Sequence, residues 1–336
     1  MDSLTHIALG ACSGAALFGK QLGKKAIWIG ALANSIPDFD FMASAWTTTD
    51  EGLLAHRGFT HSFLFCLICA VVMALFFQRL FPSVQMKLRT WVAFFALELF
   101  LHIFIDAFNA YGTGWFEPFS HYRVSFNSIF VADPFYSLWL GVAFVVLPFV
   151  WKNESRRRFW LHAGLGISTL YFMYCIVNKI KTDTDIRDML NRQAVPYNRY
   201  FTTPTPLNNW LWYIVAETDS SYAIGYYSVF DSKQQIALHY FPKNEQLLAP
   251  VANHEETNHL IRFSKGYYTV ERKSDTIVFN DLRFGQMVGW YQPNEEFVFH
   301  YYLQKKADNK LVVQRGRFAH WTMATTASLI RRIRGN

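Results

Sequence analysis

The sequence predicts an α-helical membrane bundle of four long spans and two short N-terminal helices, followed by a mainly β C-terminal domain. Hydrophobic residues make up 51% of the 336 residues and charged residues only 17%, whereas soluble domains carry about 25% charged residues. Long apolar runs fill the chain before residue 180, and short aromatic and β-branched runs follow it. We therefore expect two domains, residues 1–180 and residues 181–336.

Four runs in the first domain are long enough to cross a membrane as helices, which takes about 20 residues. They are residues 63–81, 90–110, 134–151 and 159–178. Runs such as FLFCLICAVVMALFF lack the polar face of a helix at the surface of a soluble protein. This argues against the alternative, a soluble all-α core.

Two shorter segments rich in Ala and Gly precede these runs, residues 5–18 and 26–35. Each is too short to span a membrane alone. Small residues let two helix backbones approach closely, so we expect these segments to pack as a pair.

The loop charges predict an orientation. If the helices alternate, one membrane side receives only Arg57 and Arg123 before the last helix exits. The other side receives ten cations: Lys20, Lys24, Lys25, Arg79, Lys87, Arg89, Lys152, Arg156, Arg157 and Arg158. The positive-inside rule makes this second side cytoplasmic, so the N-terminus and the second domain are expected to face outward.

The second domain shows short runs typical of antiparallel β structure, WLWYIVAE, YAIGYYSVF, DTIVFNDLRF and EFVFHYYLQ. One helix is expected between residues 243 and 263, and residues 197–209 are expected to form a linker or an extended entry strand. A basic amphipathic tail ends the chain. No basic stripe interleaved with exposed aromatic residues is apparent, so a nucleic-acid partner is not expected.

Histidines and carboxylates gather at helix ends that the predicted topology brings to one membrane face. Glu98, His102 and Asp106 are spaced i, i+4, i+8, which places them on one helical stripe. Ionisable groups inside a span cost about 2.5–3.5 kcal/mol each, and imidazole with carboxylate is the ligand set of zinc and related divalent ions. The candidate metal ligands are His6, Asp38, Asp40, His61, His102 and Asp106. The alternative is a hydrogen-bonded network without metal.

Further polar residues are candidates for catalysis. Arg57 presents a planar cation suited to phosphate, and residues 60–62 precede a helix whose exposed amides favour an anion. The candidate catalytic residues are His56, Arg57, Glu98 and His121; Asp40, His56 and Glu98 are alternatively extra ligands or groups that orient the imidazoles. His121 is alternatively a further ligand, and Arg57 alternatively marks the headgroup level. The motifs HExxH, GxSxG, GxGxxG and the P-loop are absent.

The segments THIALG, PDFD, HRGFTHS and HIFIDAFNAYGT together resemble the YdjM-like family of bacterial membrane-bound metal-dependent hydrolases. More distantly, the order of His6, Asp38, His61, His102 and Asp106 is similar to the ligand order of zinc-dependent phospholipase C and P1-type nucleases. This resemblance implies a helical site that holds zinc and hydrolyses a phosphate ester. No HxxxE follows Asp106, so two zinc ions are expected rather than three.

These observations predict an integral protein of the bacterial cytoplasmic (inner) membrane with its site and C-terminal domain outside. The expected activity is metal-dependent cleavage of a phosphate ester, in a phospholipid or lipid-linked substrate, by a metal-activated water. An envelope protein is a possible partner of the C-terminal domain. The alternatives are a metal transporter or sensor and a non-catalytic envelope scaffold.

Overall fold

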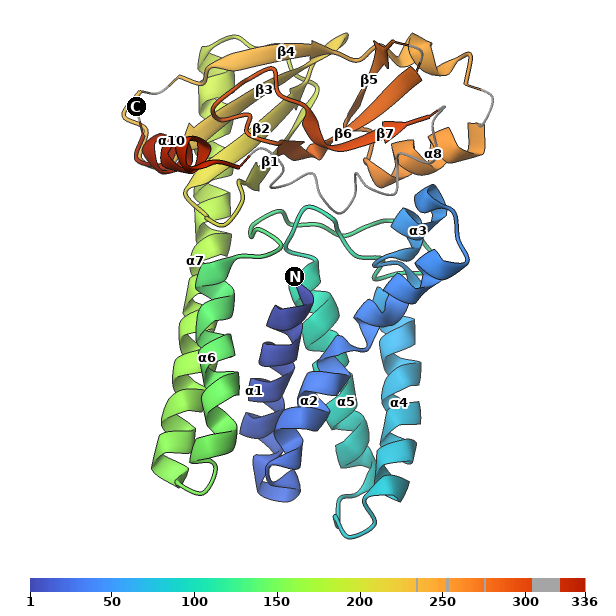
Figure 1. The fold of residues 1–336 in the computed structure, drawn as a ribbon, viewed down its shortest axis with the longest axis vertical. Coiled ribbons are helices and arrows are strands. Elements are labelled where there is room, and N and C mark those ends of the chain that lie inside the picture. Colours follow the sequence, from blue (N-terminus) through green and yellow to red (C-terminus); the bar gives the residue numbers. More distant parts are fainter. Residues whose placement is uncertain (234, 252–253, 275, 304–320, 336) are drawn as a thin grey trace. The chain divides into compact units, whose positions relative to one another are not determined.

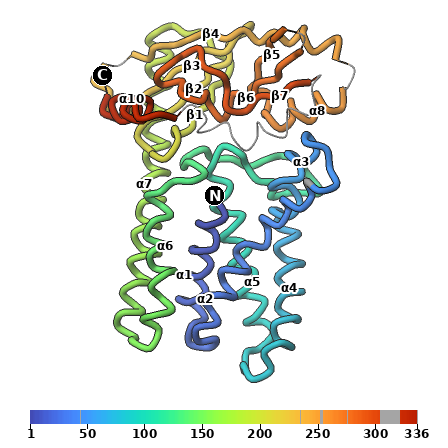
Figure 2. Tube along the Cα trace, viewed as in Figure 1, coloured from blue at the N-terminus to red at the C-terminus, as the bar shows by residue number. Residues whose placement is uncertain are grey.

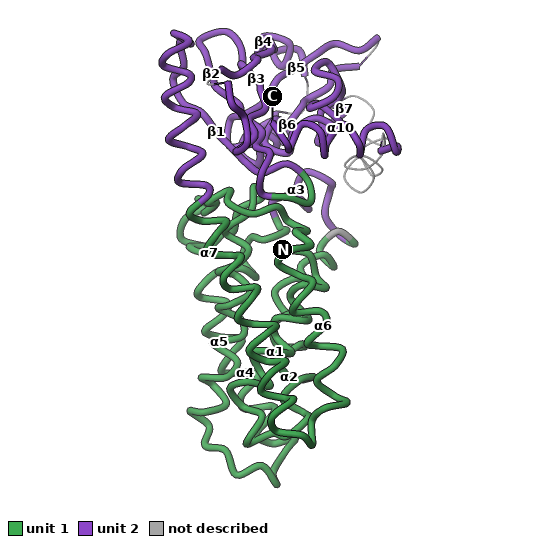
Figure 3. The backbone as a smooth tube through the Cα atoms, turned by 90° about the vertical axis from the view of Figure 1, so that its left-hand side faces the viewer, with its two compact units in different colours: residues 1–45, 55–177, 206–208 green, residues 46–54, 178–205, 209–336 purple. Residues whose placement is uncertain are grey.

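The computed structural model describes residues 1–233, 235–251, 254–274, 276–303 and 321–335 (Figure 1, Figure 2). The chain divides into two compact units (Figure 3). Unit 1 holds residues 1–45, 55–177 and 206–208, and unit 2 holds residues 46–54, 178–205 and 209–336. The division falls within one long helix, so each unit is described by itself.

Unit 1 is helical, as predicted. Its elements are α1 (Ser3–Leu22), α2 (Lys25–Ser35), the 3₁₀ helices η1 (Pro37–Ala45) and η2 (Phe59–His61), α4 (Phe63–Leu80), α5 (Leu88–Asp106), α6 (Pro134–Val150) and the first part of α7 (Glu154–Arg192). Three helices, α4, α5 and α7, are long and apolar enough to cross a membrane. Helix α6 is apolar but has 17 residues, so the predicted fourth span stays a prediction.

Helix α4 shows how the sequence places a span. Its buried side chains are Cys66, Ala70, Ala74 and Phe77, which recur every three to four residues and so form one stripe. The opposite face exposes large apolar side chains such as Ile68 and Val72. A helix that is apolar all round suits a lipid environment.

Helices α1 and α2 pack with their backbones in close contact, which confirms the predicted pair. A Cβ atom added at Gly30 would lie 2.1 Å from the carbonyl oxygen of Gly10 and 3.1 Å from the Cα atom of Gly14. Only glycine therefore fits at this crossing. The close approach matters for the site because α1 carries His6 and α2 carries Asn34, and both side chains are buried.

The described residues of unit 2 form two antiparallel sheets, as the sequence pattern predicts. The strands β1 (Arg199–Pro204), β2 (Leu211–Glu217), β3 (Ser221–Ser228) and β4 (Leu238–Pro242) form the first sheet in that order, and β5 (Tyr268–Lys273), β6 (Thr276–Gln286) and β7 (Phe297–Tyr302) form the second. Among the described residues of this unit, the helices are α3 (Thr49–Ala55), the end of α7, η3 (Glu245–Leu248), α8 (His254–Phe263) and α10 (Met323–Ile333). The predicted entry segment 197–209 forms β1, and the predicted helix between 243 and 263 is α8.

Candidate metal centre

Three chain segments bring four ligand-type side chains together in unit 1. Asp38 comes from η1, directly after α2, and His61 comes from η2, directly before α4. His102 and Asp106 lie one turn apart at the end of α5. One ligand atom from each of the four lies within 4.8 Å of the other three. Two ligands on opposite sides of a cation bound at about 2.2 Å would be about 4.4 Å apart.

The polar atoms of the four groups face one another, but most of the distances between them are longer than hydrogen bonds. His61 Nε2 lies 3.1 Å from His102 Nε2, and Asp38 Oδ1 lies 3.7 and 3.5 Å from these two nitrogens. Asp106 Oδ2 is buried and, among the described residues, accepts no hydrogen bond. The same carboxylate is paired with the Met1 ammonium through Oδ1 and with Arg57 through Oδ2. Its Oδ2 also lies 3.5 and 3.7 Å from the Nε2 atoms of His61 and His102. A divalent cation would satisfy these facing lone pairs at once.

His6 lies beside this group of four. Its Nε2 is 3.1 Å from Asp106 Oδ1, and its ring stacks on that of His102 with centroids 3.7 Å apart. The side chain is fully buried. His6 Nε2 is therefore in place to act as a further metal ligand beside Asp106.

Asn34 anchors two of the histidines by their Nδ1 atoms. Its side-chain nitrogen donates to the carbonyl oxygen of Glu98 at 2.8 Å and to Glu98 Oε2 at 3.2 Å, so its Oδ1 faces His6 Nδ1 at 3.3 Å. The backbone oxygen of Asn34 accepts a hydrogen bond from His102 Nδ1. Both rings then carry their proton on Nδ1, which leaves Nε2 of each as a lone pair for a metal.

Asp40 lies behind the third histidine, whose Nδ1 is hydrogen-bonded to Thr60 Oγ1 at 3.0 Å, and outside the group of four. Its Oδ2 accepts from the Arg57 amide at 2.7 Å and from Thr60 Oγ1 at 3.1 Å and lies 3.4 Å from His61 Nδ1. Its Oδ1 accepts from His56 Nδ1 at 2.9 Å. Burial alone would raise the pKa of Asp40, but these hydrogen bonds, chiefly the one from His56, hold it below its usual value.

The charge states of the two ligands outside the spans suit metal binding. Burial lowers the pKa of His61 to about 3, so the ring is neutral near pH 7. The pKa of Asp38 lies below its usual value because the neighbouring imidazoles of His102 and His61 outweigh its burial. A neutral imidazole and an ionised carboxylate are the forms that bind divalent metals.

Arg57 is fixed against the same carboxylate. Its Nε lies 3.3 Å from Asp106 Oδ2, its Nη1 donates to Asn109 Oδ1 at 2.8 Å and its Nη2 donates to the Met1 carbonyl at 3.1 Å. The guanidinium also lies over the Tyr111 ring, 5.0 Å from its centroid. The backbone of Arg57 has φ 58°, a left-handed conformation that a non-glycine residue keeps only where its surroundings hold it.

The structure places the remaining two candidate residues away from the group. Glu98 is buried two turns along α5 from Asp106, where Ser13 Oγ donates to it at 2.7 and 2.8 Å. His121 is exposed, and its Nδ1 pairs with Glu117 Oε1 at 2.8 Å. Of the six candidate ligands, the structure therefore brings four together, His6 beside them and Asp40 behind His61.

Sequence reasoning missed Asn34 and Ser13. Both are polar residues in helices rich in Ala and Gly, and both are buried. A buried polar side chain needs a partner, so the asparagine in ALANS, four residues before Asp38, was a usable signal.

A cavity of about 310 Å³ adjoins the candidate metal centre. Its lining residues are Met1, Asp2, Ser3, Asp38, Phe41, His56, Arg57, Tyr111 and Val131. The cavity therefore joins the carboxylates of Asp2 and Asp38, one imidazole and one guanidinium with the apolar side chains of Met1, Phe41 and Val131. A small anion that enters the cavity meets the guanidinium of Arg57, and Asp38 of the candidate metal centre forms another part of the wall.

Replacing Asn34 with leucine should lower the affinity for Zn²⁺ by about 10–100-fold, since hydrogen-bond partners of metal ligands typically contribute that much. The change removes the amide that holds His6 and Glu98 but keeps the backbone oxygen that holds His102. Competition with a chromogenic chelator measures the affinity. Asn178→Leu is the control, because Asn178 is also buried but donates to Asn209. Equal affinities in both variants would mean that the amide does not set the ligand geometry.

Comparison with known proteins places the helical unit in a family. The sequence matches the family described as YdjM inner membrane protein over residues 1–181. It is 34% identical to the uncharacterized protein YfhP of Bacillus subtilis (strain 168) over 198 residues. The aligned region covers 57% of this chain and 58% of YfhP. It is 27% identical to the inner membrane protein YbcI of Escherichia coli (strain K12) over 122 residues. That aligned region covers 36% of this chain and 69% of YbcI.

The chain thus spans less than two thirds of the length of YfhP. No solved structure matches it. The family match covers α1 to α6, all four residues of the candidate metal centre and more than half of the chain. The chain belongs to the YdjM family of inner membrane proteins.

Proposed function

We propose that the chain is a metal-dependent hydrolase of the inner membrane that cleaves a phosphate ester. The observation that supports this most is the cavity in which Arg57 and His56 lie beside Asp38 of the candidate metal centre. Cation, imidazole and metal-ligand carboxylate are the groups that phosphoryl hydrolysis uses. The similarity of the ligand order to that of zinc-dependent phospholipase C supports the same reaction.

The residues of the chain have distinct parts in this proposal. Asp38, His61, His102 and Asp106 would hold the ion, which we propose to be zinc, and a bound divalent ion supplies an activated water and charge stabilisation. Arg57 would hold the phosphate and its developing negative charge. His56 donates from Nδ1 to Asp40, so its Nε2 is the atom that would accept or donate a proton. The group of four provides for one ion, and the expectation of two ions stays a prediction.

Arg57→Lys should lower the rate of ester hydrolysis by about 10²–10³, the usual cost of one lost donor to a developing anion. Lysine keeps the charge but loses the planar fork. The assay uses purified protein and bis-p-nitrophenyl phosphate, first after chelation and then after addition of Zn²⁺. Arg79→Lys, at the far end of α4, is the control. Metal content is measured in parallel, because loss of metal in Arg57→Lys would give Arg57 a structural role at Asp106.

The proposed function fails if metal-loaded protein turns over no phosphate ester. Metal uptake into proteoliposomes would then favour a transporter. An unchanged cellular phenotype after loss of the metal would favour a scaffold whose C-terminal domain binds an envelope protein.

We also propose that the site and unit 2 face outward. The asymmetry of the loop cations supports this orientation, since ten of them fall on the opposite side and two on the side of the site. A reporter that is active only outside the cytoplasm, fused after Asn336, should give full signal. A silent fusion together with an active cytoplasmic reporter at the same position would reverse the orientation.

A further inference from the structure

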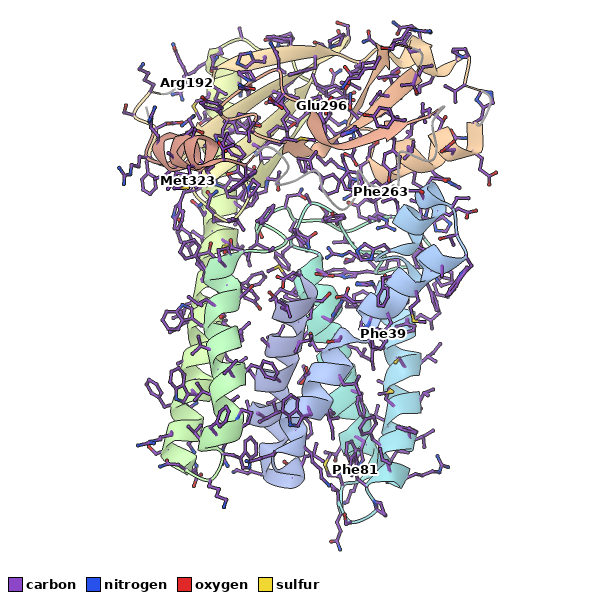
Figure 4. The ribbon with its side chains drawn as sticks, in the orientation of Figure 1. Phe39, Phe81, Arg192, Phe263, Glu296 and Met323 are labelled. Carbon is purple, nitrogen blue, oxygen red and sulfur yellow. The ribbon has the colours of Figure 1, made fainter. Side chains whose placement is uncertain are left out.

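The helix η1 separates polar and apolar side chains sharply. In PDFDFM, Asp38 and Asp40 turn inward to the histidines, as their distances of 3.4–3.7 Å from His61 nitrogens show. Phe39, Phe41 and Met42 are 49%, 62% and 54% exposed, and Figure 4 labels Phe39 on this segment. We call these three side chains the η1 rim. Large apolar side chains grouped in this way mark a surface that contacts something apolar.

The η1 rim continues into the surface of the membrane-spanning helices. Helix η1 packs against η2, where Phe59 is exposed and its ring lies 5.9 Å from that of Phe65 on α4. Phe63, at the start of α4, is exposed and stacks on Phe100 of α5 at 6.5 Å. Because the exposed faces of α4 and α5 suit lipid, the surface that begins at the rim is continuous with a lipid-facing one.

The rim also borders the cavity of the candidate site. Phe41 lines that cavity together with Asp38, His56 and Arg57. The spans begin and end at the candidate metal centre, with Asp106 the last residue of α5 and His61 two residues before α4. Tyr and Trp side chains near the ends of spans lie at the level of the lipid headgroups, and Tyr111, five residues after the end of α5, lines the cavity. The cavity is therefore at the depth where a membrane lipid carries its phosphate.

From this geometry, and resting on the proposed function, we infer that the substrate is a phosphate ester carried by a membrane lipid. Its phosphate enters the cavity between Arg57 and Asp38, and its apolar chain lies on the η1 rim. The partner of the rim is the bilayer itself. A water-soluble ester would engage the same polar groups but would leave the rim unused.

Two esters with the same reacting group test this inference: p-nitrophenyl hexadecyl phosphate and p-nitrophenyl methyl phosphate. In each, water adds to phosphorus, the bond to p-nitrophenolate breaks, and the released p-nitrophenolate is measured. In proteoliposomes of phosphatidylglycerol we expect kcat/KM for the hexadecyl ester to exceed that for the methyl ester by at least about tenfold, from burial of the chain. Equal values would overturn the inference.

The variant Phe41→Ser should lower this hexadecyl-to-methyl ratio by about tenfold, since it removes an apolar contact for the chain. Phe41→Leu keeps the position apolar and should restore most of the ratio. Phe149→Ser is the matched control. Phe149 is also highly exposed, but it lies at the C-terminal end of α6 and does not line the cavity. An unchanged ratio in Phe41→Ser, or an equal fall in Phe149→Ser, would overturn the inference.

A second measurement does not depend on hydrolysis. A benzophenone amino acid at position 39 should form photo-crosslinks to phosphatidylglycerol, as the same group at position 149 should. Crosslinks from position 39 to protein alone would overturn the rim as a lipid contact. If neither ester is cleaved but lipid crosslinks form, the proposed function fails while the contact of the rim with the bilayer stands.

Discussion

His102→Ala should leave purified protein with less than about a tenth of the metal that the unchanged chain retains. Structural and catalytic zinc sites use three or four protein ligands, and the change removes one of four. His102 is central among them, since its Nε2 lies 3.1 Å from His61 Nε2 and 3.5 Å from Asp38 Oδ1. Elemental analysis of the protein after dialysis against Zn²⁺ measures the metal content.

A matched control and a second variant make this result decisive. His121→Ala should keep the full metal content, because His121 is exposed and pairs with Glu117. Asp106→Asn changes one oxygen and little volume, so it tests the site even if His102→Ala fails to fold. Retention of metal by both His102→Ala and Asp106→Asn would show that this group of four does not bind the ion.

Gly30→Leu should destabilise the helical unit by about 3 kcal/mol or more, the upper end of the cost of overpacking. The first atom of any side chain at Gly30 would lie 2.1 Å from the backbone oxygen of Gly10. Backbone cannot rotate away as a side chain can, so α1 and α2 must separate. Thermal unfolding in detergent measures the loss, and metal affinity should fall with it because His6 and Asn34 lie on these two helices.

Gly141→Leu is the control for this substitution. Gly141 lies inside α6, and a Cβ atom there would meet nothing within 4 Å. Leucine is the better helix former, so this variant should unfold at or above the temperature of the unchanged chain. If Gly30→Leu unfolds at the same temperature as Gly141→Leu, the close contact of α1 and α2 does not contribute to stability.

Hydrophobic patterning predicted the elements well because it depends on neighbouring residues only. Three of the four apolar runs became helices long enough to span a membrane, and the short aromatic runs of the second half became antiparallel strands. The last helix differs: the run 159–178 is part of α7, which continues to Arg192. Its polar end carries no apolar run, so hydropathy alone could not extend it.

The candidate site could be predicted only in part, and the i, i+4, i+8 stripe of α5 shows why. Spacing along a helix places Glu98, His102 and Asp106 on one face, but eight residues rise about 12 Å. One cation cannot reach both ends of such a stripe. Which end it occupies depends on where η1 and η2 deliver Asp38 and His61, and the structure delivers them to the end with Asp106.

The two carboxylates of PDFD separate in the same way. Both turn inward, yet Asp38 Oδ1 faces the Nε2 atoms of His61 and His102, while Asp40 Oδ2 lies on the Nδ1 side of His61. Residues two apart in sequence have similar local surroundings, so nothing local distinguishes them. The side of the imidazole that each one meets is decided by helix packing.

By itself, the sequence determined the helical and β halves, the apolar spans, the close pairing of α1 with α2 and the pool of histidines and carboxylates, because each of these follows from composition or from spacing along one element. The tertiary structure decided which four of that pool share a centre, that Asn34 orients two histidines, and that Phe41 borders the cavity. These depend on contacts between residues up to 100 positions apart, such as that of His6 with Asp106. Distances of that kind are fixed by how helices cross, which no local pattern encodes.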